Sequence, residues 1–341
     1  MHPPSPRLVV LLTAALTLGL TACSVEESGS ASPTAGTPDD TADGSTDPAA
    51  GTAADDPDAD ATSDPQGGFP VTVDSDSGEV TIQARPERIV SLSPSATEIL
   101  FAIGAGDQVI AADQFSTYPA EAPTTDLSGF DPNVEAIVAY EPDLVVIATD
   151  ANDLVASLGE LDIPVLAQEA PVDVEAGYDL VAGLGQATGQ VDGTAELVAT
   201  MRAEMEEALA SAADAEGVRV YHELDDTFFS ASSASFIGSI YSALGAVNVA
   251  DEADTEGTGY PQLTEEAVIE ANPQLIVVTD QGASTAEDVA ARPGWDAVDA
   301  VRTGSIVSVD ADIASRWGPR LPQLVTSLAE AITEAAVPAG R

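Results

Sequence analysis

Short runs rich in β-branched residues alternate with amphipathic stretches of helical period from Phe69 to the end of the chain. This alternation is typical of α/β units with largely parallel sheets. A leading β-hairpin is expected over residues 71–83, with its turn at Asp76-Ser77-Gly78. Strands are expected at residues 88–92, 108–112, 144–148, 165–167, 218–222, 275–279 and 305–309. The alternation therefore predicts an α/β fold with mainly parallel central sheets.

The two halves of this region resemble each other. Residues 134–150 hold an apolar helical stretch, a proline and a β-branched run, and residues 265–280 repeat that order. Glu135 and Glu266 each lie seven residues before the proline. A helix, proline and strand in this order are common in α/β proteins, so chance similarity is the alternative. The agreement of several landmarks in the same order favours a duplication.

Residues 192–215, between the two halves, carry apolar side chains at helical spacing among acids. No glycine or proline interrupts them after Gly193. At about 1.5 Å per residue, such a helix would be roughly 36 Å long, enough to run from one lobe to the other. We therefore expect two similar lobes with a ligand cleft between them: an N-terminal lobe at residues 69–190, a connecting helix at 191–216 and a C-terminal lobe at 217–341.

The amino terminus predicts export. The apolar run from Leu8 to Leu20 is too short to span a bilayer but suits the core of a signal peptide. It ends in Leu20-Thr21-Ala22-Cys23, which resembles a bacterial lipobox with Cys23 as the lipidated residue. An ordinary secretory signal with an incidental cysteine is the alternative. Residues 1–22 are thus expected to be a lipoprotein signal peptide, and lipid to be the only anchor at the outer face of the membrane.

Composition separates a tether from the folded region and excludes several classes of partner. Residues 23–68 are dominated by small, polar and acidic residues that cannot bury a core, which predicts a disordered acidic tether. In the whole chain 10 Lys+Arg, all of them arginine, stand against 58 Asp+Glu. A formal net charge of −48 excludes nucleic acid as a partner. The single cysteine excludes a disulfide framework and a zinc site built on cysteine pairs.

Four motifs, taken in order, resemble the helical-backbone (class III) substrate-binding proteins of ABC importers. They are Ile89 to Leu100 (IVSLSPSATEIL), Tyr118-Pro119, Glu135 ahead of Pro142-Asp143-Leu144-Val145, and Gly259 to Thr264 (GYPQLT). The resemblance covers about residues 85–336. It implies a monomeric extracytoplasmic receptor without cofactor or metal site, which delivers a metal chelate to a permease. The motifs lean toward a cobalamin-type corrinoid, with ferric siderophores close behind and haem as a further alternative.

The resemblance also implies roles for aromatic residues. Tyr118 and Tyr260 look like the aromatic walls of the first and second lobe, and loop packing is the alternative for both. Phe229 occupies a position where relatives place an aromatic residue, and one of Phe228 and Phe229 is expected in the core. Phe130 matches a family aromatic position less cleanly.

Polar residues around the expected cleft have two readings each. Ser93 and Ser95 follow the first strand, so they either offer hydroxyl and N–H groups to a ligand or cap the next helix. Arg316 either binds a ligand oxygen or forms a structural ion pair, which is the favoured role of Arg320. Trp317 covers the ligand or a neighbouring helix, whereas Trp295 is expected in the core.

Glu135 and Glu266 look like the paired acids that dock such receptors onto arginines of the permease, and surface carboxylates without a partner are the alternative. His222 is the only histidine of the expected mature chain. It is expected to be a packed strand residue rather than an axial ligand of a metal. A secreted hydrolase is the competing class, but the sequence lacks a Gly-x-Ser-x-Gly elbow, a Gly-rich phosphate loop and a metal-binding histidine pair. A tethered adhesion module would not require the two-lobe repeat.

Overall fold

The computed structural model describes residues 68–337, and two four-stranded parallel sheets form its framework. One sheet has the strand order β4-β3-β5-β6 and the other has the order β8-β7-β9-β10. The strands are β3 (Ile89–Leu92), β4 (Val109–Ala112), β5 (Leu144–Ile147), β6 (Val165–Ala167), β7 (Arg219–His222), β8 (Val247–Asn248), β9 (Leu275–Thr279) and β10 (Ile306–Val309). The predicted α/β fold with two similar lobes and mainly parallel sheets is confirmed.

The repeat extends to strand register. Leu144 of β5 lies opposite Ile89 of β3, and Leu275 of β9 lies opposite Val220 of β7. Leu144 and Leu275 each stand two residues after the proline of the repeated segment. Every residue of β3 and β5 is buried, as expected for strands covered on both faces. The two lobes therefore share strand order and pairing register as well as a sequence pattern.

The leading hairpin is present as β1 (Val71–Val73) and β2 (Val80–Ile82), which pair antiparallel. The predicted parallel strands match the observed ones to within one residue, and residues such as Arg88 and Ala148 already belong to the connections. The expected strands did not include β8. This edge strand has two residues, Val247 and Asn248, too few for an alternating pattern to register.

Eleven α-helices lie within the described residues. They are α1 (Pro94–Ala102), α2 (Val134–Val138), α3 (Leu154–Gly159), α4 (Val174–Thr188), α5 (Val191–Ser211), α6 (Phe236–Ala243), α7 (Glu265–Ala271), α8 (Ala286–Ala290), α9 (Asp299–Thr303), α10 (Ala311–Ser315) and α11 (Leu321–Ala336). Short 3-10 turns cover Gly106–Gln108, Ala151–Asp153 and Trp295–Ala297. Within residues 68–337, none of the helices is long and apolar enough to cross a membrane.

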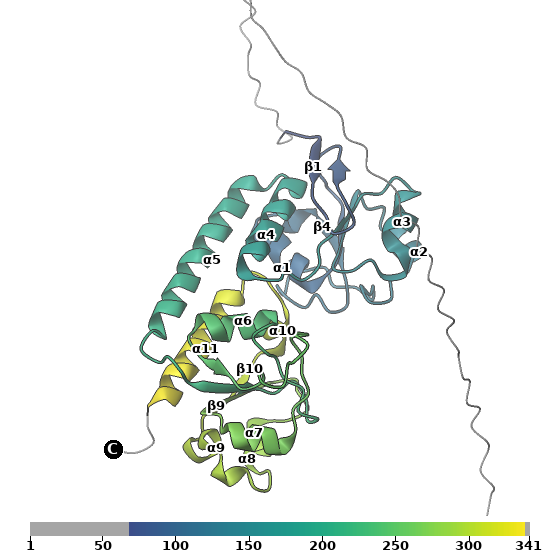
Figure 1. The fold of residues 1–341 in the computed structure, drawn as a ribbon. Helices are drawn as coiled ribbons and strands as arrows, with labels where there is room; N and C mark the ends of the chain where they lie inside the picture. Colours follow the sequence, from purple (N-terminus) through teal and green to yellow (C-terminus); the bar gives the residue numbers. More distant parts are fainter. Residues whose placement is uncertain (1–67, 338–341) are drawn as a thin grey trace, which may run out of the picture. The chain divides into compact units, whose positions relative to one another are not determined.

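Helix α5 is the long helix expected between the lobes. It follows the first sheet along the chain and precedes the second, and it contacts both α4 and the final helix α11 (Figure 1). It ends at Ser211, four residues earlier than expected. Ala212 caps the helix with a non-helical backbone conformation, and residues 212–214 form turns.

One hydrophobic core passes through both lobes. It joins Ile99 of α1 and Leu144 of β5 to Met201 of α5 and to Leu275 of β9. Separate smaller cores cover the other face of each sheet, and Trp295 lies fully buried in that of the C-terminal lobe, as predicted. Because the shared core contains α5 and α11, the lobes are joined by packed side chains as well as by the chain itself.

Candidate ligand cleft

Two adjoining cavities lie where the lobes meet. The larger, of about 500 Å³, is lined from the N-terminal lobe by Ser95 and Phe130 and from the C-terminal lobe by Arg316. The smaller, of about 370 Å³, is lined by His222 and Tyr260 and is mostly apolar. Both cavities share Ala170, Pro171, Ser315 and Trp317 as walls. Together they form the cleft, which has walls from both lobes.

The carboxyl ends of the first strand of each sheet open onto the cleft. Strand β3 has β4 on one side and β5 on the other, and β7 is placed likewise between β8 and β9. Ligands bind at such switch points in open parallel sheets. The equivalent strand ends are therefore the part of the fold that the topology prepares for a ligand.

Ser93 and Ser95 differ in what they offer to the cleft. Ser93 is buried, and its Oγ accepts a hydrogen bond from the N–H of Ala96 at 3.3 Å, which caps α1. Ser95 lies in the first turn of α1, is half-buried and makes no hydrogen bond through its side chain among the described residues. Both line the larger cavity, so Ser95 has the hydroxyl that is not already committed to a cap.

Exposed aromatic residues surround the cleft. Phe115, Phe130 and Tyr260 line the cavities, and the Phe130 side chain is 78% exposed. Phe115 and Phe130 meet edge to face with ring centroids 5.5 Å apart. Tyr118 and Phe229 are exposed but do not line either cavity. The sequence expectations did not include Phe115, whose only signal was its position three residues before Tyr118.

Of the adjacent pair Phe228 and Phe229, one was expected in the core. Phe228 stacks on Trp295 with ring centroids 6.3 Å apart and packs against the core of the C-terminal lobe. Phe229 is 38% exposed. The core member is therefore Phe228, which leaves Phe229 at the surface.

Arg316 and Arg320 share one buried carboxylate, that of Glu98 in α1. Arg320 donates to Glu98 through Nε at 2.8 Å and through Nη2 at 2.6 Å, and Arg316 donates through Nη1 at 3.2 Å. Arg316 also pairs with Asp312 at 2.8 Å, and Arg320 lies 4.3 Å from the ring centroid of Tyr118. Hydrogen bonding to Glu98 raises the pKa of Arg320. Both arginines are therefore held in ion pairs, the alternative reading for Arg316.

Trp317 forms a wall between the two cavities while remaining only 5% exposed. Its indole lies against Gly177 of α4, where an added Cβ would come within 1.9 Å of Trp317 Cε2. Its ring meets Tyr178 edge to face at 5.8 Å between centroids. Trp317 therefore packs on a neighbouring helix, as one of its two expected roles, and it also borders the cleft.

His222 ends β7 and is 2% exposed at the wall of the smaller cavity. Its Nδ1 is hydrogen-bonded to the Tyr241 hydroxyl at 2.7 Å. Burial lowers the pKa of His222 to about 4, so the ring is neutral at physiological pH. Within residues 68–337 no group of His, Cys, Asp or Glu has the arrangement of a metal site. His222 is the packed strand histidine that was expected.

Glu135 and Glu266 occupy matching positions. Each is the second residue of its helix, α2 or α7, and each is exposed. Asn133 and Thr264 cap the two helices by accepting from the backbone N–H three residues ahead, at 2.9 and 3.2 Å. The neighbouring Glu265 instead accepts from Trp295 Nε1 at 2.9 Å. Glu135 and Glu266 are therefore equivalent, accessible carboxylates on the two lobes.

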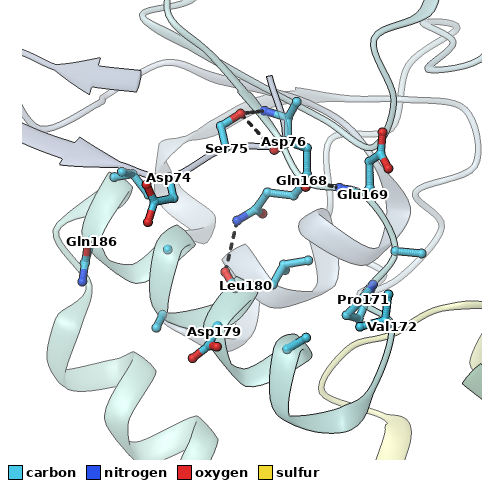
Figure 2. Close-up of a pocket in the computed structure, with 16 residues that line it drawn as sticks. Asp74, Ser75, Asp76, Gln168, Glu169, Pro171, Val172, Asp179, Leu180 and Gln186 are labelled. Carbon is cyan, nitrogen blue, oxygen red and sulfur yellow. Dashed lines mark hydrogen bonds between the residues drawn. The ribbon is translucent and has the colours of Figure 1, made fainter. Parts of the chain in front are cut away.

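A further pocket of about 670 Å³ lies behind the cleft wall, between the turn of the leading hairpin and α4 (Figure 2). Its residues Gln168 to Pro171 also line the larger cleft cavity. Ser75 Oγ and the N–H of Asp76 both donate to Ala167 O at 3.0 Å, so the hairpin turn holds the start of this segment. The aromatic residues of the cleft are absent from this pocket's lining, so the cleft is the better candidate site. Cys23 and the expected tether lie outside the described residues.

Comparison with known proteins agrees with this architecture. Residues 89–313 match the family model described as Periplasmic binding protein. The chain is 32% identical over 275 residues to an uncharacterized ABC transporter substrate-binding lipoprotein of Bacillus subtilis (strain 168), covering 77% of this chain and 86% of that protein. It is 32% identical over 276 residues to a cobalamin-binding protein of Halobacterium salinarum (strain ATCC 29341 / DSM 671 / R1), covering 77% and 74%. The solved apo structure of a periplasmic heme-binding protein from Roseiflexus sp. RS-1 matches with a TM-score of 0.65 at 27% identity, covering 74% and 100%.

Proposed function

Because the chain belongs to the periplasmic binding protein family, we propose that it is the extracytoplasmic receptor of an ABC importer for a metal chelate. Its first candidate ligand is a cobalamin-type corrinoid and its second is a ferric siderophore, with haem as an alternative. The receptor binds and delivers its ligand without chemical change. The names of the cobalamin-binding and lipoprotein relatives support this choice.

The observation that carries the proposal is the cleft with aromatic walls from both lobes. Phe115 and Phe130 come from one lobe and Tyr260 from the other, and flat side chains stack on large planar ligands with little loss of conformational entropy. Contiguous exposed apolar side chains, such as the touching rings of Phe115 and Phe130, are typical of ligand-binding grooves. A ring-shaped chelate seated on these side chains accounts for their exposure.

Intrinsic tryptophan fluorescence tests the proposal, because Trp317 borders the cleft whereas Trp295 is buried in the C-terminal lobe. Titration of the purified receptor with cyanocobalamin, a ferric hydroxamate and haem should give saturable quenching with at least one of them. In Trp317→Phe the quenching amplitude should fall more than the affinity, because the reporter is lost but the aromatic walls remain. Absence of saturable binding to all three chelates, or turnover of a generic ester, would contradict the receptor function.

We propose that Glu135 and Glu266 dock the receptor on the permease and that Cys23 anchors it through lipid. The matching, exposed positions of the two glutamates on α2 and α7 support the docking role. The double variant Glu135→Ala/Glu266→Ala should abolish uptake by cells and leave the ligand affinity of the purified protein unchanged. The matched control Glu160→Ala/Glu270→Ala removes two other exposed glutamates and should leave uptake intact. Weakened ligand binding in the docking variant would refute this division of roles.

A further inference from the structure

We propose that Glu98 sets the charge selectivity of the cleft: by binding both arginines of the C-terminal wall, it makes the receptor accept neutral or cationic chelates and reject anionic ones. This inference rests on the proposed function. It concerns the charge of the chelate that is bound, and it assigns this selectivity to Glu98, which does not itself line either cavity.

Glu98 is buried as a charged group and has no partner in its own lobe among the described residues. Its side chain is 1% exposed, and its carboxylate accepts from Arg316 and Arg320, more than 200 residues further along the chain. A carboxylate this deeply buried requires such partners, because an unpaired charge in the interior is strongly destabilising. The two arginines are therefore committed to Glu98 as part of the folded structure.

Among residues 68–337, Arg316 is the only arginine that lines either cavity, and both of its terminal nitrogens already donate to protein acceptors. Nη1 donates to Glu98 at 3.2 Å, while Nη2 donates to the Phe115 carbonyl at 3.0 Å and pairs with Asp312 at 2.8 Å. Its side chain is only 11% exposed. An anionic ligand group could engage Arg316 fully only by displacing one of these partners.

The charges around the larger cavity consequently leave no positive excess. Glu98 and Asp312 balance Arg316 and Arg320, and Glu169 is a further acid in the lining. The chain has no lysine. The remaining described arginines each donate to protein acceptors elsewhere: Arg85, Arg88, Arg202, Arg219, Arg292 and Arg302.

An anionic chelate would bring its charge from water to a site that cannot neutralise it. Burial of an uncompensated charge costs binding free energy. Because specificity is the difference between the binding free energies of two ligands, a site that penalises anionic chelates selects neutral or cationic ones. A neutral corrinoid or a cationic ferric hydroxamate carries no such cost. Haem, through its two propionates, and a ferric tris-catecholate carry it in full.

The test compares Glu98→Gln with Glu223→Gln. The first substitution keeps the shape of the side chain but leaves the Arg316 and Arg320 pair with one extra positive charge. Glu223 is also 1% exposed and also binds an arginine, Arg292, with two contacts of 2.6 Å, but neither residue lines a cavity. Glu223→Gln therefore controls for the loss of a buried ion pair as such.

Affinities for cyanocobalamin and haem, and for a cationic ferric trihydroxamate and an anionic ferric tris-catecholate, are measured at low and high salt. Wild-type protein should favour the neutral or cationic member of each pair. Glu98→Gln should shift the ratio toward the anionic member by at least tenfold at low salt, and less at high salt. Glu223→Gln should leave the ratio unchanged.

Asp312→Asn gives a second route that does not depend on the folding of Glu98→Gln. The Asp312 side chain is 34% exposed and pairs with Arg316. The substitution removes this negative charge from the same arginine, so the affinity ratio should shift in the same direction. The inference is overturned if wild-type protein prefers the anionic chelates, if the ratio fails to shift in folded Glu98→Gln, or, where that variant does not fold, if it fails to shift in Asp312→Asn. Failure of wild-type protein to bind any chelate would instead refute the proposed function itself.

Discussion

Ser91 of the N-terminal lobe and His222 of the C-terminal lobe occupy the same position in the repeated sheet, opposite Val146 and Val277 respectively. Ser91 accepts from the Thr97 hydroxyl at 2.8 Å, in a buried chain that continues through Ser116 to Asp113. His222 meets Tyr241 in a single hydrogen bond. The same framework thus holds unlike polar groups, because the apolar strand pattern sets the topology and each lobe satisfies its buried polar atoms in its own way.

The buried glutamates extend this comparison. Glu223 immediately follows His222 and pairs with Arg292, also in the C-terminal lobe. Glu98 of the N-terminal lobe finds its arginines in the C-terminal lobe. The first pair therefore ties elements within one lobe, whereas the second ties the lobes together beside the cleft.

The largest expected effect comes from removing the carboxylate that is satisfied within one lobe. Glu223→Ala leaves Arg292 without its ion-pair partner, and breaking a buried pair in this way costs about 3–5 kcal/mol in the free energy of unfolding. Urea denaturation followed by circular dichroism measures this loss. Glu270→Ala, on the exposed surface of α7, is the control and should unfold like the wild type. A cost below 1 kcal/mol for Glu223→Ala would show that the pair does not hold the lobe together.

A smaller effect on the free energy of unfolding should depend on pH and arise from His222 in the C-terminal lobe. Burial lowers the pKa of His222 to about 4, whereas the unfolded chain binds the proton near pH 6.5. Stability is therefore lost as the pH falls from about 6.5 toward 4, by up to about 3 kcal/mol at about 1.4 kcal/mol per pKa unit. Urea titrations at pH 7, 6 and 5 should show a shallower decline for His222→Gln than for the wild type. Equal declines would mean that the pKa of His222 is the same in the folded and unfolded protein, and so is not lowered by burial.

The smallest effect is expected at the matching position of the N-terminal lobe. Ser91→Ala removes one partner of Thr97, which retains Ser116 and the Ser93 carbonyl, so the loss should be about 1 kcal/mol and independent of pH between 5 and 7. The same urea titrations measure it. A loss comparable to that of Glu223→Ala would show that the hydroxyl chain acts as a single cooperative unit.

Local pattern was sufficient for most of the fold. The repeated helix, proline and strand units, the leading hairpin and the long helix could be located because periodicity and turn residues act over a few positions. The end of α5 was misplaced because Ala212 and Ala215 continue the apolar spacing of the helix although the helix itself ends at Ser211. Strand β8 was too short to leave a pattern.

The residues of the candidate cleft could be predicted only in part from the sequence. The aromatic residues Phe130 and Tyr260 could be proposed from motif and position, and the structure brings them to cavities that adjoin one another. The roles of Phe115 and Glu98 could not be predicted from the sequence, because each depends on partners that are distant in the chain. A residue's local sequence carries no information about which distant side chain will meet it.

The sequence by itself determined the two-lobe α/β framework, since apolar periodicity and the repeated proline specify strands and helices locally. It also showed that positive charge is scarce in the chain, since ten arginines stand against 58 acids. Only the tertiary structure decided which acid each arginine meets, because a buried charge takes the partner that folding brings within reach. The meeting of Arg316 and Arg320 with Glu98 follows from the packing of the two lobes and from nothing local to any of the three residues.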